Sequence, residues 1–211
     1  MSVTLDHLVV AAASLGQGAE YIHSVLDVYP VMGGKHVLMG THNMLLNLGN
    51  QTYLEIIAID PEAPHPGRPR WFGLDEPEVQ AQLGKSPRLI HWVARTDDIR
   101  ASVASSSLDL GEVSEASRGD LRWLITLPKD GKPLGDGLIP TLIEWGAAHP
   151  TDSLSGAGCE LLGLTGFHPD PEPIGSALKT IGAQDSLRLE RTPELRLEAR
   201  IRTPSGVKLL R

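Results

Sequence analysis

Four side chains able to bind a metal or move a proton stand in apolar surroundings in this sequence. Each is the one histidine or glutamate in a run of Val, Ile, Leu and aromatic residues: "LDHLVVAA", "TYLEIIAI", "RLIHWVAR" and "TLIEWG" contain His7, Glu55, His91 and Glu144. An ionised carboxylate in an apolar interior is costly, so it must be exposed, protonated, paired or bound to a metal. Neutral imidazoles and carboxylates can share a divalent cation, which removes that cost.

The spacing of these residues favours a shared site. Residues two apart in a strand point the same way, so each of the four shares its face with mainly apolar or small neighbours. They occur in the order His–Glu–His–Glu. A single histidine in a strand is more often a hydrogen-bonded core residue, and a single glutamate more often faces solvent. The joint pattern predicts convergence on one cavity if the strands curl towards each other.

The elements that carry these residues form a repeat. A predicted helix, "GQGAEYIHSVLDVY", and a predicted strand, "HNMLLNLG", separate the first two runs; "DDIRASVASSSLDLG" and "LRWLITLP" separate the last two in the same way. This internal repeat divides the chain into a first module (1–60), a Pro-rich connector (61–87), a second module (88–150) and a C-terminal βαββ extension (151–211). Either the modules pair within one chain, or they exchange between two chains and give a homodimer.

Composition narrows the class of protein. Hydrophobic residues make up 41% of the 211 residues, and the formal net charge of −7 disfavours nucleic acid and anionic membranes as partners. Cys159 is the only cysteine, so no intrachain disulfide forms. The N-terminus lacks the pattern of a signal peptide, and no run is long enough for a membrane helix. We expect a cytoplasmic protein whose partner is a small-molecule substrate.

The segments "LDHLVVAA", "GTHNMLLNLGNQTYLEIIAIDP" and "IPTLIEWGAAHP" resemble the glyoxalase-like domain family of the vicinal oxygen chelate superfamily. The resemblance implies an α+β fold, in which paired βαβββ modules form a cupped mixed β-sheet. It also implies a divalent metal bound by the first and last strands of each module, at His7, Glu55, His91 and Glu144. Such a mixed donor set suits Zn, Ni, Co, Fe or Mn alike.

The stretch "GGKHVLMGTHN" is a candidate pocket wall. Its glycines permit unusual backbone angles or close approach of a ligand, and His36, His42 and Asn43 supply donors and acceptors for the polar part of a substrate. The alternative interpretation is an exposed turn in which these side chains bond to the backbone.

The predicted reaction follows from a metal with open positions. A substrate with two neighbouring oxygens would chelate it, and Glu144 or Glu55 would take the proton next to the carbonyl, as in a glyoxalase-like lyase or isomerase. Two alternatives stay open. One is an Fe(II) extradiol-type dioxygenase using His7, His91 and Glu144, and the other is a small-molecule-binding protein without chemistry.

Overall fold

The structure, a computed structural model, describes residues 3–211. Residues 4–145 fold in the order β-α-β-β-β twice. The first repeat consists of β1 (Thr4–Ala11), α1 (Leu15–Leu26), β2 (Val31–His36), β3 (Thr41–Asn47) and β4 (Tyr53–Ile59). The second consists of β5 (Arg88–Arg95), α3 (Ile99–Ser105), β6 (Glu112–Arg118), β7 (Leu121–Leu127) and β8 (Thr141–Trp145). The segment between the two repeats contains a short 3₁₀ turn (Trp71–Gly73) and helix α2 (Pro77–Leu83).

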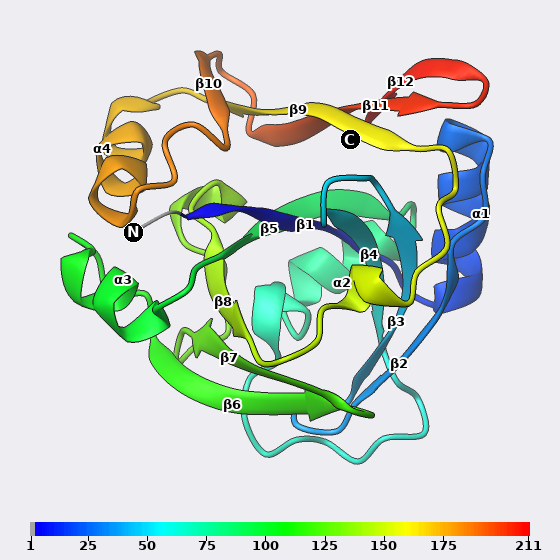
Figure 1. The fold of residues 1–211 in the computed structure, drawn as a ribbon, viewed down its shortest axis with the longest axis horizontal. Helices are drawn as coiled ribbons and strands as arrows, with labels where there is room; N and C mark the ends of the chain where they lie inside the picture. Colours follow the sequence, from blue (N-terminus) through cyan, green and yellow to red (C-terminus); the bar gives the residue numbers. More distant parts are fainter. Residues whose placement is uncertain (1–2) are drawn as a thin grey trace.

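The two βαβββ repeats share one eight-stranded sheet in the order β2-β3-β4-β1-β5-β8-β7-β6. Strands β1 and β5 pair antiparallel at its centre, while β1 pairs with β4 and β5 with β8 in parallel. The repeats therefore pair within one chain. The sheet curls into a cup, as Figure 1 shows, and the Arg118 side chain of β6 reaches back to the opposite edge. The predicted α+β fold with a cupped mixed sheet is confirmed.

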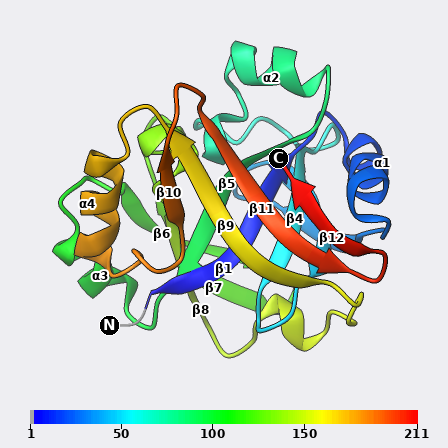
Figure 2. The ribbon, with the colours of Figure 1, turned by 90° about the horizontal axis from the view of Figure 1, so that it is seen from above.

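The C-terminal segment forms a separate four-stranded sheet in the order β10-β9-β11-β12. Its elements are β9 (Glu160–His168), α4 (Glu172–Ile181), β10 (Arg188–Arg191), β11 (Arg196–Thr203) and β12 (Gly206–Leu210), one strand more than the βαββ unit expected from the sequence. This sheet lies across the outer face of β1 and β5 (Figure 2). It thereby covers the convex side of the cup.

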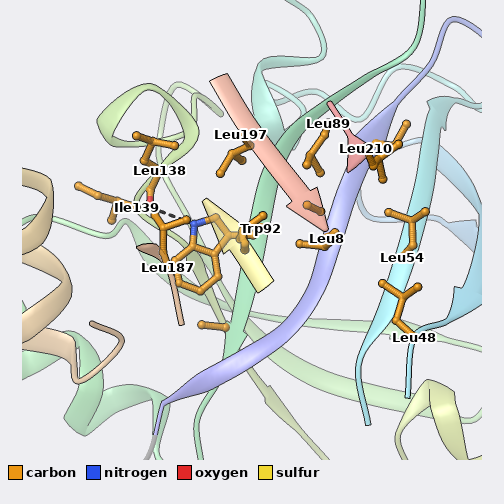
Figure 3. Close-up of a cluster of buried hydrophobic side chains, with 14 of the residues drawn as sticks. Leu8, Leu48, Leu54, Leu89, Trp92, Leu138, Ile139, Leu187, Leu197 and Leu210 are labelled. Atoms are coloured by element: carbon orange, nitrogen blue, oxygen red, sulfur yellow. Dashed lines mark hydrogen bonds between the residues drawn. The ribbon is translucent and has the colours of Figure 1, made fainter. Parts of the chain in front are cut away.

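The main hydrophobic core lies between these two sheets. Trp92 is fully buried there, with Leu8 from the large sheet and Leu197 from the small one (Figure 3). Its indole Nε1 donates to the Leu138 carbonyl at 3.0 Å, which satisfies the one polar atom of the side chain. Burial of this size stabilises the fold by about 1.5–3 kcal/mol per large apolar side chain.

A second apolar cluster fills the concave side of the cup. It joins Val9, Ile57 and Val93 from the strands to Trp71 and Phe72 from the segment between the repeats. The sequence favours a solvated connector there, but both aromatic side chains are buried. Phe72 has a φ of +60°, a backbone conformation that non-glycine residues seldom adopt. The connector thus closes the mouth of the cup.

Helices α1 and α3 begin at side-chain caps. The Ser14 hydroxyl accepts from the Gln17 N–H at the start of α1, and the Asp98 carboxylate accepts from the Ala101 N–H at the start of α3. Within residues 3–211, no helix combines the length and the apolar character needed to cross a membrane.

Candidate functional site

His7 and Glu55 face each other on the concave side of the sheet. They come from the adjacent parallel strands β1 and β4, where Val9 is the backbone partner of Glu55. The His7 Nε2 atom lies 3.7 Å from the Glu55 Oε2 atom, which is longer than a hydrogen bond. Both side chains are more than nine-tenths buried and line a small chamber. Two of the four predicted site residues are therefore brought together.

Asp6 fixes the orientation of His7. Its fully buried carboxylate is 2.6 Å from His7 Nδ1 and also receives hydrogen bonds from Trp145 Nε1 and His149 Nε2, at 3.0 and 3.1 Å. Burial alone would raise the pKa of Asp6, but the bonds from His149 and His7 outweigh burial and hold the pKa well below its usual range. An ionised carboxylate only accepts, so His7 Nδ1 carries a proton, and in the neutral ring Nε2 would present its lone pair to the chamber.

A β-irregularity brings Asp6 and His7 together. Neighbouring side chains in a regular strand point to opposite faces. The pairing of β1 with β5 shifts register between Leu5 and His7, and the two adjacent side chains bond at this shift. The dipeptide Asp-His at the start of an apolar strand was the only sequence signal for the pair.

Glu55 is held by an amide from the neighbouring strand. Asn43 Nδ2 donates to Glu55 Oε1 at 2.6 Å and approaches His36 Nε2 at 3.3 Å. Asn43 Oδ1 accepts from the Gly34 N–H and from Arg118 Nη1. All the contacts of this amide are consistent with one orientation of its oxygen and nitrogen atoms. Asn43 therefore links the carboxylate of Glu55 to the guanidinium of Arg118.

His36 is a neutral member of this cluster. Burial lowers its pKa to about 4, with Glu55 acting in the opposite sense. Its Nδ1 lies 3.0 Å from the Thr41 hydroxyl, and its Nε2 lies 3.4 Å from Arg118 Nη1. Because Nε2 faces N–H donors, it is the accepting nitrogen. The predicted pocket-wall role fits the positions of His36 and Asn43.

His42 and Glu144 lie outside this cluster. His42 sits on the other face of β3, with Nδ1 4.0 Å from Asp60 Oδ1. Glu144 likewise belongs to the outer face of β8, and its Oε2 accepts from the Ile99 N–H at 2.7 Å, at the start of α3. In β8 the residues on the concave side are Ile143 and Trp145. The structure therefore places the predicted catalytic Glu144 on the opposite side of the sheet from Glu55.

His91 faces the concave side, but both of its nitrogens are engaged. Nδ1 donates to the Gly137 carbonyl at 3.0 Å, and Nε2 accepts from the Thr141 N–H at 3.1 Å. Burial lowers the pKa of His91 to about 4, so the ring is neutral. The lone pair that a metal would need is used by the backbone of β8.

Aromatic side chains form the remaining wall of the chamber. Five of the chain's nine Phe, Trp and Tyr residues line it, namely Tyr53, Trp71, Phe72, Trp123 and Trp145. The enclosed volume is about 20 Å³, which is room for about one water molecule. The indole N–H groups of Trp71 and Trp123 are buried without a hydrogen-bond partner. Such donors are costly to leave unpaired, so a ligand oxygen that paired with them would be stabilised.

Arg118 and Phe72 were not anticipated as site residues. Arg118 lies at the end of β6 in the second repeat but bonds to a side chain of the first. A Cβ on Gly34 would come within 2.8 Å of the Arg118 side chain, so glycine there permits the approach. The glycines of this stretch were expected to permit close approach, but the sequence did not show which residue would make the contact.

The predicted four-ligand metal centre does not fit this arrangement. His7 Nε2 and Glu55 Oε2 face one space, but His91 is saturated by Thr141 and Gly137, and Glu144 caps α3. Among the described residues, no three His, Cys, Asp or Glu side chains are arranged to hold a metal ion. The metal expected from the resemblance therefore stays a prediction.

Comparison with known proteins bears on the family and the fold. Residues 5–182 match the glyoxalase-like domain. Among curated proteins, none matches the chain. A hypothetical protein from Staphylococcus aureus of known structure is 13% identical, with a TM-score of 0.63 over 93% of this chain and 88% of that one. Methylmalonyl-CoA epimerase from Mycobacterium tuberculosis is 19% identical, with a TM-score of 0.44 over 72% of this chain and 92% of that one.

Proposed function

The chain belongs to the glyoxalase-like domain family and thereby to the vicinal oxygen chelate superfamily. On this premise, we propose that it is an isomerase or lyase acting on a small substrate with neighbouring oxygens. Its reaction would begin with removal of the proton on the carbon next to a carbonyl. The observation that carries the proposal is the pair of acceptors, His7 Nε2 and Glu55 Oε2, 3.7 Å apart in a buried chamber.

His7 is suited to take the proton. Its Nδ1–H is held by an ionised carboxylate, so Nε2 is an acceptor before the reaction, and the imidazolium formed afterwards lies between Asp6 and Glu55. The carbon–hydrogen bond breaks, its electron pair moves into the new carbon–carbon double bond, and the carbonyl oxygen becomes an enolate oxygen. Return of the proton to the former carbonyl carbon, with transfer of the neighbouring hydroxyl proton to the enolate oxygen, completes an isomerisation. Expulsion of a leaving group completes an elimination.

The aromatic wall of the chamber would stabilise the negative charge that develops on the enolate oxygen. The unpaired indole N–H groups of Trp71 and Trp123 are the buried donors available in the chamber wall. Donors that gain a partner only when an oxyanion is present stabilise the transition state more than the free protein. Loss of one such donor typically lowers the rate by about 10²–10³-fold.

Hydrogen–deuterium exchange at the carbon next to the carbonyl tests this function. The protein would be incubated in D₂O with hydroxyacetone, lactate, pyruvate and glycolaldehyde, and ¹H NMR would follow loss of the carbon-bound proton. We expect exchange of at least one compound with the parent protein and a loss of about 10²–10⁴-fold in His7→Gln and Glu55→Gln. Exchange that is unchanged in both variants would contradict the proposal.

A second candidate is a binding protein without chemistry. The low aromatic content of the sequence argues against a stacking pocket, but the structure gathers five of nine aromatic residues around one chamber. Tight binding of an aromatic or planar ligand, with no exchange of any of the four compounds and no effect of His7→Gln on affinity, would favour this candidate.

A further inference from the structure

Arg118 is a cation that forms no ion pair within the described residues. Its Nη1 bonds to the neutral acceptors Asn43 Oδ1, at 2.9 Å, and His36 Nε2, at 3.4 Å. No carboxylate of residues 3–211 forms an ion pair with it, whereas Lys35, nearby on β2, is paired with Asp60 and Glu62. A half-buried guanidinium gains most from an anionic partner, because a hydrogen bond to a charged acceptor is roughly twice as strong as one to a neutral acceptor.

Arg118 also separates the chamber from a surface groove. It lines the chamber beside Glu55 and also lines an outer groove of about 510 Å³ between β2 and the β6–β7 hairpin. That groove presents the exposed apolar side chains of Val31 and Met32 and contains no acidic residue. Its lining therefore favours a ligand that is partly apolar and negatively charged.

From these observations we propose that Arg118 determines substrate specificity by binding a carboxylate, so that the substrate is a small 2-oxo or 2-hydroxy carboxylic acid entering through this groove. This assignment rests on the function proposed for His7 and Glu55. The two oxygens of a carboxylate match the two parallel N–H groups that a guanidinium offers.

The order of side chains along the wall suits such a substrate. Arg118 bonds to Asn43, Asn43 bonds to Glu55 at 2.6 Å, and Glu55 faces His7. A carboxylate at Arg118 would therefore lie on the same wall as the two proton acceptors, with the Asn43 side chain between it and Glu55. The one positive charge of Arg118 also matches a single negative charge. A phosphate dianion would add a second charge near the buried carboxylate of Glu55.

Binding of matched probes tests the assignment. Isothermal titration would compare pyruvate with butane-2,3-dione, which keeps the neighbouring oxygens but has no charge, and with inorganic phosphate. The parent protein should bind pyruvate at least about tenfold more tightly than either. Arg118→Gln should weaken pyruvate binding by about 10- to 100-fold and leave butane-2,3-dione unaffected, while Arg118→Lys should recover part of the loss.

Arg122→Gln is the matched control, because it removes a cation from the exposed part of the same hairpin, where Arg122 bonds only to backbone carbonyls. Equal losses for pyruvate and butane-2,3-dione in Arg118→Gln would overturn the assignment, since they would mark a structural role. Absence of pyruvate binding, or tighter binding of phosphate, would overturn it too.

The two proposals can fail separately. Pyruvate binding that depends on Arg118 and survives in His7→Gln, together with no proton exchange in the parent protein, would support the carboxylate site and contradict the catalytic function. Exchange of hydroxyacetone that depends on His7 but not on Arg118, without any preference for carboxylates, would support the function and overturn the carboxylate site.

Discussion

Asp6 and His7 are neighbours in one strand, and their side chains nevertheless share a hydrogen bond of 2.6 Å in the interior of the protein. The register shift in β1 makes this possible, and Trp145 and His149 complete the shell of donors around the carboxylate. The pair sets the tautomer of His7 and therefore decides which nitrogen faces Glu55. Asp6 acts through His7 and is a positioning residue.

Asp6→Asn should reduce turnover far more than substrate binding. The amide no longer requires Nδ1 to carry the proton and cannot stabilise the imidazolium, so we expect kcat to fall by about 10²–10⁴-fold with little change in KM. Stability should fall by about 1–3 kcal/mol, because a charged acceptor is lost from a buried network. ¹⁵N NMR of His7 separates the two effects, since a changed tautomer would be visible in the folded variant. A preserved tautomer together with full activity would contradict the positioning role.

Stability should decline on acidification between pH 6.5 and pH 4, because two buried histidines resist protonation in the folded protein. The pKa values of His36 and His91 are lowered by burial from 6.5 to about 4, so between these values the unfolded chain binds more protons than the folded protein. Stability is therefore full above about pH 6.5 and decreases towards pH 4, by up to about 3 kcal/mol for each histidine. Asp6 adds nothing to the slope in this range, because its lowered pKa contributes stability that is lost only below the unfolded value of 3.8.

Urea unfolding measured from pH 8 to pH 4 checks this dependence. His91→Gln should flatten the slope between pH 6.5 and 4, whatever its effect on stability at pH 8. His65→Gln is the control, because His65 is exposed in a loop and should leave the slope unchanged. A parent protein with constant stability over this range would contradict the neutral, buried state of the two rings.

Glu144→Gln should affect stability more than activity. The carboxylate accepts from the Ile99 N–H at the first turn of α3, where a negative charge is favourable, so its loss should cost about 0.5–2 kcal/mol. Proton exchange should remain within about twofold of the parent rate. A loss of exchange as large as that in Glu55→Gln would instead support the role in catalysis that the sequence pattern predicts for Glu144.

Metal content distinguishes the two-ligand arrangement seen in the structure from the four-ligand centre expected from the sequence. With only two of the four predicted ligands, His7 and Glu55, directed into one space, a divalent ion should bind weakly and be removed by chelation without unfolding the protein. Elemental analysis of untagged protein, before and after loading with Zn, Ni, Co, Mn or anaerobic Fe(II), makes the measurement. Near-stoichiometric metal that survives gel filtration and is lost in a His7→Ala/Glu55→Gln variant would contradict this expectation and support the predicted centre.

The repeat and the family could be recognised from local sequence. Apolar runs such as those around His7 and Glu55 specify strands, because alternation and β-branched content reflect a pleated, buried surface. The two runs also lie in neighbouring parallel strands, as the βαβββ order requires. His36 and Asn43 were expected on a pocket wall because glycines accompany them, and they lie beside Glu55.

Which face of a strand looks into the cup could not be determined in the same way. Alternation shows that Ile143 and Glu144 point in opposite directions. Both faces of this sheet are covered, however, one by the connector and one by the C-terminal sheet, so the sequence pattern does not mark either face as solvent-exposed. Asp6, Arg118 and Trp71 are equally beyond a local pattern. The role of Asp6 depends on a register shift in β1, and that of Arg118 depends on the curl that brings β6 to β2. The role of Trp71 depends on a connector folded into the cup. The sequence by itself therefore determined the strands, their duplication and the residue types at the site. Only the tertiary structure decided which of those residues meet, because contacts between distant segments are set by the packing of the two covered faces.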